Sequence, residues 1–301
     1  IYSPAFPDNI QKNVLPLHKV YTLKCAPLRG GRLARTPHPG DTRTHDTMKE
    51  KLTLIKVGGK IVEQPDLLDT LLRHFAAIPG HKVLVHGGGR TATDLAAQLG
   101  IETRMVEGRR ITDADTLRVV TMVYAGLVNK NIVAKLQGAG VKSFGICGAD
   151  FGCIRSVRRP VTPEGVDYGF VGDVVDVDYD AISLLLFKNC VPVVAPITCD
   201  MNGQLLNTNA DTVASELASA LSRIFDVTLT FCFEKEGVLD ADDRLIPRID
   251  SASFEALKAD GTVSGGMLPK LENAFAALRR GVSQVRIASA SAPDAGTSIV
   301  L

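Results

Sequence analysis

Continuous apolar runs alternate with apolar residues at helical spacing from residue 48 to the end of the chain. Residues 52–57, 191–197 and 226–233 are apolar segments of strand length, a pattern typical of strands buried on both faces. Apolar residues three and four apart predict helices that begin near Pro65, Gly89, Thr112, Asn209 and Gly266. This alternation predicts an α/β fold, a three-layer sandwich whose largely parallel central sheet carries helices on both faces.

The segment 144–178 departs from this alternation. Its short alternating pieces, residues 153–161 and 168–178, are punctuated by glycines and predict β-hairpins that cover one edge of the sheet. The chain divides naturally near residue 225. We therefore expect an N-terminal lobe over residues 48–225 and a C-terminal lobe over residues 226–301.

Residues 1–47 have a different composition from the rest. They hold six of the fifteen prolines and three of the six histidines, with an excess of basic residues and no sustained periodicity. Such a segment is expected to be a disordered leader outside the packed core. Because Met48 directly precedes the first strand, the leader could be upstream sequence that is not native. Its basic, acid-poor composition also leaves an organelle transit peptide open.

The overall composition favours small-molecule partners. With 301 residues, 45% of them apolar, and a net charge of +1, the chain can bury a large core and has no global bias toward nucleic acid. No apolar run approaches eighteen residues, so we expect no membrane association. The six cysteines form no C-x-x-C pair, which favours reduced thiols in a cytoplasmic protein.

Two glycine-rich turns follow predicted strands thirty residues apart. Residues 52–60 read LTLIKVGGK, and residues 82–90 read KVLVHGGGR. Glycine lets backbone N–H groups approach an anion closely, and a helix that starts at once aims its positive end at the same point. Lys56 could add a full positive charge. Neither turn matches the P-loop or the dinucleotide-binding fingerprint, so the pair predicts an anion site of another kind.

A polar segment, residues 203–214, precedes a predicted helix and contains Asn207, Asn209 and Asp211. Asn209 or Asp211 could serve as a helix cap alone. Three short polar side chains at alternate positions exceed what one cap needs, and strand geometry would place them on one side. They could then hold a ligand's amide groups and orient a lysine.

Two further motifs carry isolated basic residues. In GGMLPK, residues 265–270, glycines precede a helix and Lys270 lies one turn inside it, with its side chain reaching back toward the N-terminus. In EGRRIT, residues 107–112, Arg110 ends a predicted hairpin and could grip a carboxylate with two hydrogen bonds. Taken singly, each is better explained as a solvated surface residue.

Taken together and in order, these motifs are similar to those of the amino-acid kinase family. IKVGGK, VHGGGR, EGRRIT followed by NKN, LNTNAD, EKEGVLD and GGMLPK have the order and spacing of that family, and most resemble its N-acetylglutamate kinase branch. The resemblance covers residues 51–301. It implies phosphorylation of the side-chain carboxylate of N-acetyl-L-glutamate by ATP, a step of arginine biosynthesis.

The resemblance also implies roles for individual residues. The catalytic residues would be Lys56 and Lys270, which flank the transferring phosphoryl group, and Asp211, which organises both lysines. The substrate-binding residues would be Gly88, Gly89, Arg110, Asn207 and Asn209. The nucleotide-binding residues would be Gly58, Gly59, Glu234, Lys235, Glu236, Gly237, Val238, Leu239, Thr262, Val263 and Ser264. Magnesium would be bound through the ATP phosphates, with no protein ligands assigned.

Several points depart from the family pattern or stay open. FEKEGVL replaces the more usual nucleotide loop, and residues 144–159 are an unusual version of the acyl-group region. N-succinyl-L-glutamate is therefore an alternative substrate, with Arg155, Arg158 or Arg159 able to meet its extra carboxylate. A catalytically silent amino-acid or nucleotide sensor is a second alternative. The N-terminal segment lacks helical periodicity, so we expect an arginine-insensitive homodimer formed through the N-terminal lobe.

Overall fold

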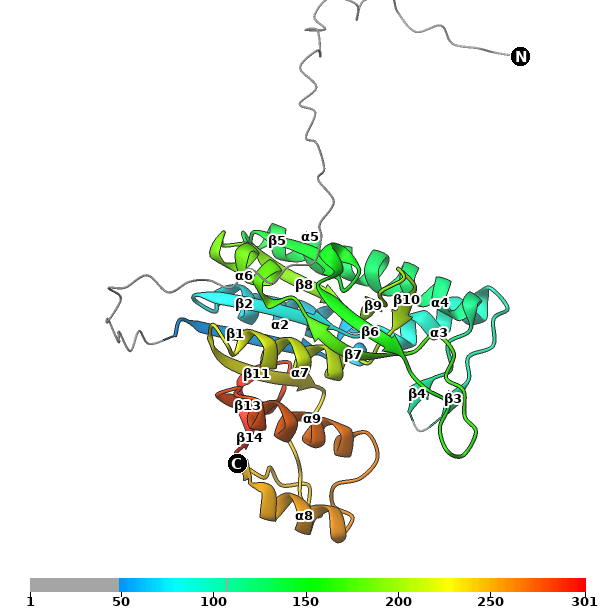
Figure 1. The fold of residues 1–301 in the computed structure, drawn as a ribbon. Coiled ribbons are helices and arrows are strands. Elements are labelled where there is room, and N and C mark those ends of the chain that lie inside the picture. The colour runs from blue at the N-terminus through cyan, green and yellow to red at the C-terminus, as the bar shows by residue number, and fades with distance from the viewer. Residues whose placement is uncertain (1–48, 107) are drawn as a thin grey trace, which may run out of the picture. The chain divides into compact units, whose positions relative to one another are not determined.

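The computed structural model describes residues 49–106 and 108–301, and the predictions for the leader lie outside this part of the chain. Residues from Met48 to Leu301 form one compact unit. Its largest sheet has the strand order β12-β14-β13-β11-β1-β2-β8-β5 (Figure 1). The strands are β1 Lys51–Val57, β2 His81–His86, β5 Ser143–Cys147, β8 Val191–Ala195, β11 Asp226–Phe233, β12 Arg248–Ile249, β13 Gln284–Ser289 and β14 Ala292–Ile299.

The centre of this sheet is parallel, as predicted. β1 pairs in parallel with β2 and β11, β8 pairs in parallel with β2 and β5, and β13 joins β11 in the same sense. Only β12 and β14 run the other way among the described strands, since β13 and β14 are antiparallel. The carboxyl ends of the parallel strands meet at one edge, where α/β folds place their ligands.

Helices cover both faces of the sheet. One face packs against α1 Gly59–Val62, α2 Pro65–Ala77, α3 Gly89–Gln98, α4 Ala114–Thr121, the π-helix η1 Met122–Val128 and α5 Asn129–Gly138. The other packs against α6 Tyr179–Phe187, α7 Ala210–Leu221, α8 Ser251–Ala259 and α9 Met267–Arg279. Two separate apolar cores result, so the fold is the predicted three-layer sandwich.

Strand alternation decides which side chains meet which helices. In β1, Leu52 and Leu54 belong to the core under α7 and α9, whereas Ile55 and Val57 belong to the core under α2 and η1. Because side chains along a strand alternate between its two faces, Lys56 lies on the same face as Leu52 and Leu54 and points toward α7 and α9. His86 in β2 follows Leu84 onto the opposite face, toward η1 and α5.

The prediction for residues 144–178 was partly wrong. β6 Ile154–Arg158 and β7 Gly172–Val177 do pair antiparallel. However, they belong to a second sheet of order β10-β9-β6-β7, with β9 Ile197–Cys199 and β10 Leu205–Asn207. The edge of the main sheet is β5 instead. β9 and β10 come from a segment distant in sequence from β6 and β7. The local pattern of residues 144–178 could therefore not reveal that β9 pairs with β6.

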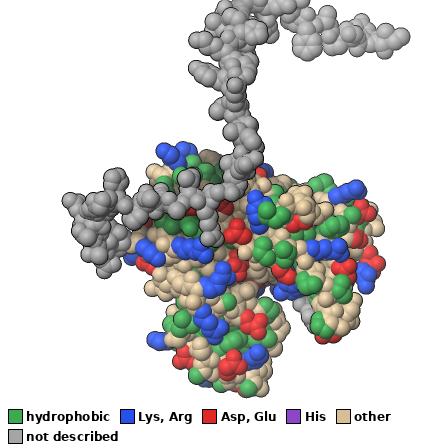
Figure 2. All heavy atoms as spheres, viewed as in Figure 1, with side chains coloured by type: hydrophobic (Ala, Val, Ile, Leu, Met, Phe, Trp, Pro, Cys, Tyr) green, Lys and Arg blue, Asp and Glu red, His purple; other side chains and the backbone are tan. Residues whose placement is uncertain are grey.

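Smaller elements complete the described chain. β3 Met105–Val106 and β4 Arg109–Arg110 form a short antiparallel pair, and η2 Asp150–Gly152 is one 3₁₀ turn. Helix α8 was not predicted. On the face drawn in Figure 2, basic and acidic side chains are interspersed. Among the described helices, none has the length and apolar character needed to cross a membrane.

Candidate active site

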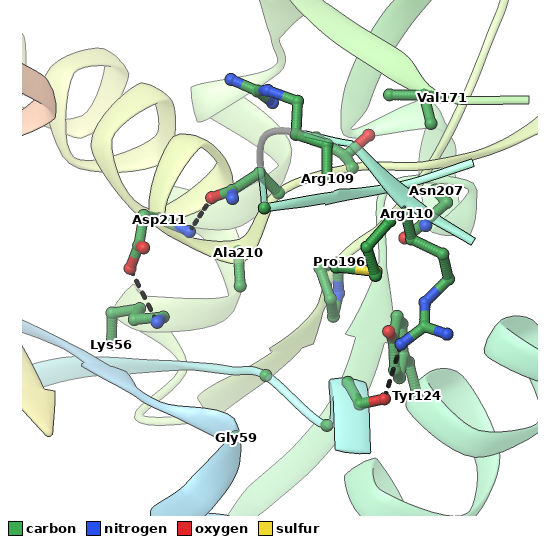
Figure 3. Close-up of a pocket in the computed structure, with 17 residues that line it drawn as sticks. Lys56, Gly59, Arg109, Arg110, Tyr124, Val171, Pro196, Asn207, Ala210 and Asp211 are labelled. Atoms are coloured by element: carbon green, nitrogen blue, oxygen red, sulfur yellow. Dashed lines mark hydrogen bonds and ion pairs between the residues drawn. The ribbon is translucent and has the colours of Figure 1, made fainter. Parts of the chain in front are cut away.

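A pocket of about 210 Å³ lies where the two glycine turns meet β4 and the segment before α7. Its lining includes many of the residues predicted from sequence to act on a substrate: Lys56, Gly59, Gly88, Gly89, Arg110, Asn207, Asn209 and Asp211. Figure 3 shows that Lys56 and Asp211 point toward each other at one end, while Arg110 and Tyr124 lie at the other. The pocket therefore has two chemically different ends.

Two lysines converge on one carboxylate at the first end. Lys56 Nζ lies 2.7 Å from Asp211 Oδ1, and Lys270 Nζ lies 2.9 Å from Asp211 Oδ2. The geometry follows from the fold, because Lys56 points toward α7 and α9, Asp211 lies in the first turn of α7, and Lys270 lies in the first turn of α9. The three groups carry a net positive charge. This end of the pocket is suited to an anion.

Asp211 is a buried carboxylate that stays ionised. Burial alone would raise the pKa of the Asp211 carboxyl, but the charges and hydrogen bonds of Lys56 and Lys270 lower it to about 2. The negative charge in turn holds two ammonium groups close together. The Asp211 carboxylate is thus ionised at every pH at which the protein would work.

The glycine turns leave little room for a side chain at Gly87. A Cβ on Gly59 would make ordinary contact, at 3.4 Å, with the backbone nitrogens of Gly88 and Gly89, whereas a Cβ on Gly87 would lie 3.0 Å from Gly59 N, closer than side chains normally come. Gly88 has φ 157°, a conformation that L side chains rarely adopt. Gly58 donates its N–H to the Cys232 carbonyl at 3.0 Å, so this N–H ties the turn to β11.

Arg110 is buried, at 8% exposure, and anchors the second glycine turn. Its Nη2 donates to the Gly89 carbonyl at 2.7 Å and to Thr93 Oγ1 at 2.9 Å, and its Nη1 donates to Thr103 Oγ1 at 3.1 Å. These bonds engage three of the five N–H donors of a guanidinium. The remaining donors and the charge make this end suited to a carboxylate.

Tyr124 also lines this end, and the sequence analysis missed it. Burial raises the pKa of the Tyr124 phenol, and the neighbouring Arg110 charge opposes that rise. A tyrosine in the apolar stripe of a predicted helix is a signal that could have been noticed. The stripe gave no indication that η1 faces the glycine turn.

The polar segment before α7 is built differently from the prediction. Asn209 is the N-cap of α7, and its Oδ1 accepts the N–H groups of Asp211 at 2.8 Å and Thr212 at 3.2 Å. Asp211 is therefore helical, and the strand geometry assumed for it was wrong. Asn207 ends β10 and donates from Nδ2 to Thr112 Oγ1 at 3.0 Å. All three side chains nevertheless face the same pocket because the chain turns at the cap.

Comparison with known proteins identifies the fold and its chemistry. The model of the amino acid kinase family matches residues 51–289. The chain belongs to the amino acid kinase family. It is 61% identical over 259 residues to an acetylglutamate kinase of Bacteroides fragilis, covering 84% of this chain and 98% of the relative. It is 63% identical over 248 residues to one of Bacteroides thetaiotaomicron, covering 81% and 96%.

Solved structures agree on the fold of this family member. The structure of smu.665 from Streptococcus mutans has a TM-score of 0.70 and 27% identity, and covers 83% of this chain and 98% of that one. Carbamate kinase from Giardia lamblia bound to AMP-PNP has a TM-score of 0.61 and 16% identity, with 83% and 98% covered. At that identity the second likeness concerns the fold alone.

Apart from Gly59, the nucleotide-binding residues predicted from the family lie outside the pocket. Residues 234–239 follow β11, and residues 262–264 precede α9. Val238 and Val263 are each 2% exposed and belong to the same apolar core, so both segments pack on the C-terminal half. Glu234 Oε1 lies 3.3 Å from Lys60 Nζ. The assignment of these segments to a nucleotide stays a prediction.

The arginines considered for a succinyl carboxylate do not line the pocket. Arg158 pairs with Asp167, whose Oδ2 lies 2.9 Å from Nη2, and Arg159 pairs with Asp173. Arg155 lies in β6 of the second sheet. Among the described residues, the arginines that line the pocket are Arg109 and Arg110.

Proposed function

We propose that this protein transfers the γ-phosphoryl group of ATP to the side-chain carboxylate of N-acetyl-L-glutamate, giving N-acetyl-L-glutamyl 5-phosphate in arginine biosynthesis. The observation that carries the proposal is the Lys56–Asp211–Lys270 unit at one end of a pocket whose other end holds Arg110. The two Bacteroides relatives named acetylglutamate kinase, each above 60% identity, support the same substrate.

The chemistry needs charge more than it needs an acid or a base. A carboxylate acceptor is already ionised, so the barrier comes from bringing one anion onto another. Lys56 and Lys270 would neutralise the phosphoryl oxygens as charge develops on them, while Asp211 fixes the two ammonium groups in place. A silent sensor of the same fold would have no need for this buried, fully charged unit.

The acceptor would lie along the pocket. Arg110 would bind its α-carboxylate, Asn207 its amide, and the N–H groups of Gly88 and Gly89 the carboxylate that attacks. Asn209, as the cap of α7, would hold the segment that presents Asn207 and Asp211. These groups orient the substrate so that its side chain points toward Lys56.

ATP would bind over the C-terminal lobe, with its phosphates directed at Gly58, Gly59 and Lys270. Within residues 49–106 and 108–301, there is no cluster of three His, Cys, Asp or Glu side chains that could hold a metal ion, and Asp211 is engaged by two lysines. Magnesium would be bound through the β- and γ-phosphates, where it would neutralise charge on the nucleotide.

The decisive test is a coupled assay of the purified protein with magnesium-ATP. It compares N-acetyl-L-glutamate, N-succinyl-L-glutamate and L-glutamate, with Asp211→Asn as the inactive control. We expect the highest kcat/KM with the N-acetyl substrate. A clear preference for the N-succinyl substrate would reassign the acyl group, and turnover of neither acylated substrate would refute the proposal.

We further propose a cytoplasmic homodimer formed through the N-terminal lobe. Met122 and Leu127 on η1 are 54% and 52% exposed, and Leu99, at the end of α3 in the same lobe, is 55% exposed. Apolar side chains of this size on one lobe are suited to an interface with a second copy. Light scattering of the purified protein tests this, and a monomer at micromolar concentration would contradict it.

A further inference from the structure

The second glycine turn is preceded by a histidine that the proposed mechanism does not use. His86 ends β2, has 0% exposure, and faces η1 and α5. Its Nδ1 lies 2.8 Å from the Gly87 carbonyl oxygen, and its Nε2 lies 3.1 Å from Asn129 Nδ2. Both ring nitrogens are therefore engaged by neighbours, although no substrate would touch the ring.

The neighbours of Asn129 determine which way its amide points. Lys130 Nζ donates to Asn129 Oδ1 at 3.1 Å, and an ammonium can only donate. Asn129 Nδ2 donates to the Val193 carbonyl at 2.9 Å, and a carbonyl can only accept. The NH₂ group of Asn129 thus faces His86. His86 Nε2 must accept, and the ring proton is on Nδ1.

This tautomer makes the Gly87 carbonyl a fixed acceptor. In a trans peptide the carbonyl and the next N–H lie in one plane and point in opposite directions. When His86 Nδ1–H holds the Gly87 oxygen on the interior side, the N–H of Gly88 is turned the other way, toward the pocket that Gly87, Gly88 and Gly89 line. Glycine has no side chain to fix this plane by packing, so a hydrogen bond has to do so.

The network is built into three strands of the sheet. Lys130 Nζ also donates to the Gly145 carbonyl of β5 at 3.1 Å, and Val193 lies in β8. A Cβ at position 145 would lie 1.6 Å from Asn129 Oδ1, so the strand must carry glycine there. Asn129 comes directly after the π-helix η1, a kind of helix frequent at functional sites. Contacts with β2, β5 and β8 therefore fix the position of the Asn129 amide.

The ring is also kept neutral. Burial lowers the pKa of His86 to about 4, the Gly87 hydrogen bond opposes that shift, and the Lys130 charge adds to it. A second ring proton would face the Asn129 NH₂ group, which is itself a donor. At neutral pH the ring therefore holds one proton.

We propose that His86 is a positioning residue of the reaction. Its neutral Nδ1–H tautomer, set by Asn129 and Lys130, orients the Gly87–Gly88 peptide so that the Gly88 N–H meets the attacking carboxylate of the acceptor. This inference rests on the proposed function. It adds a residue that shapes the acceptor site without touching the acceptor.

Three variants test the role. His86→Leu removes the ring hydrogen bonds, whereas His86→Asn keeps an N–H donor near the position of Nδ1. His81→Asn is the matched control, because His81 begins the same strand at its other end and pairs with Glu50. Thermal unfolding establishes that each variant is folded before kinetics are measured.

We expect His86→Leu to lower kcat/KM for the acylated glutamate by about 10- to 100-fold, less than or comparable to the loss of one preorganised donor. KM for ATP should stay within about twofold, His86→Asn should recover most of the loss, and His81→Asn should match the wild type. A purely structural role would reduce folded protein, lowering the rate without changing the KM for either substrate. Equal kinetics for His86→Leu and the wild type would overturn the proposal.

A second measurement does not depend on activity. In ¹⁵N-histidine-labelled protein, the His86 ring resonances, assigned by their loss in His86→Asn, should show protonated Nδ1 and unprotonated Nε2 at neutral pH. An Nε2–H tautomer or a doubly protonated ring would refute the network even if the kinase activity is confirmed. If the wild type phosphorylates no acylated glutamate but the tautomer is as stated, the proposed function fails and the network stands.

Discussion

Replacing Asp211 with asparagine tests the charge balance of the site most directly. The variant keeps the size of the side chain but removes the negative charge between Lys56 and Lys270. Two ammonium groups then remain close together, and Lys56 at 6% exposure has little access to water. We expect a loss of both stability and catalysis.

The stability change can be estimated from the pKa. The pKa of the Asp211 carboxyl falls from 3.8 to about 2 on folding. Since one pKa unit corresponds to about 1.4 kcal/mol, the ionised carboxylate contributes about 2 kcal/mol to the free energy of unfolding at pH 7. A depressed pKa stabilises above the unfolded value, and the contribution is lost as the pH falls through the folded value. About half of it should remain at pH 3.

The assay is urea unfolding of wild type and Asp211→Asn at pH 7 and pH 3. The difference in free energy of unfolding should be about 2 kcal/mol or more at pH 7 and should shrink at pH 3. Asp115→Asn is the matched control, because Asp115 forms an exposed pair with Arg118 and should change stability by less than about 0.5 kcal/mol at either pH. An Asp211→Asn variant as stable as the wild type at pH 7 would refute the reasoning.

The remaining predictions concern catalysis and binding. Lys270→Met should lower kcat by roughly 10²- to 10⁴-fold in the coupled assay. The control Lys60→Met, which changes a 73% exposed side chain, should leave kcat within about twofold of the wild type. Equal losses of kcat in the two variants would contradict the catalytic role of Lys270. Arg110→Lys should raise KM for the acceptor about 10-fold or more, because one ammonium cannot replace three guanidinium bonds; an unchanged KM would argue against a carboxylate at this end. Tyr124→Phe should raise the same KM by about two- to tenfold through loss of one pocket hydroxyl, without changing KM for ATP. Gly87→Ala should lower kcat while the protein remains folded, since its Cβ would lie 3.0 Å from Gly59 N and push the two glycine turns apart, and wild-type kcat would show that the turns do not need this close packing.

Much of the architecture was readable from the chain because it depends on local chemistry. Continuous apolar runs of strand length favour buried strands, and apolar stripes between them favour covering helices, so the parallel sheet and its layers were predicted. The glycine turns, Lys56, Asp211 and Lys270 each lie at a strand end or helix start. Position alone gave only a weak signal for them, and their roles were predicted from the resemblance of the ordered motifs to the amino-acid kinase family.

Other features depended on contacts between distant segments. Leu99 and Leu127 lie at helical spacing from other apolar residues but are largely exposed, since helical spacing identifies one face of a helix and does not show whether another element covers it. Asp211 was placed in a strand-like segment, whereas the cap by Asn209 makes it helical. The second sheet likewise required β9 to meet β6 across a long stretch of chain.

The fold class and most of the groups that face the pocket could thus be predicted from the chain. How those groups act on one another became visible only in the folded protein: which end of the pocket carries which charge, that Arg110 anchors the glycine turn, and that Tyr124 and the His86–Asn129 pair lie next to that turn. The difference lies in the distance along the chain over which each effect acts. Apolar periodicity and backbone preference depend on residues close in sequence, whereas a hydrogen-bonded network and a shifted pKa exist only once strands and helices far apart in the chain have packed together.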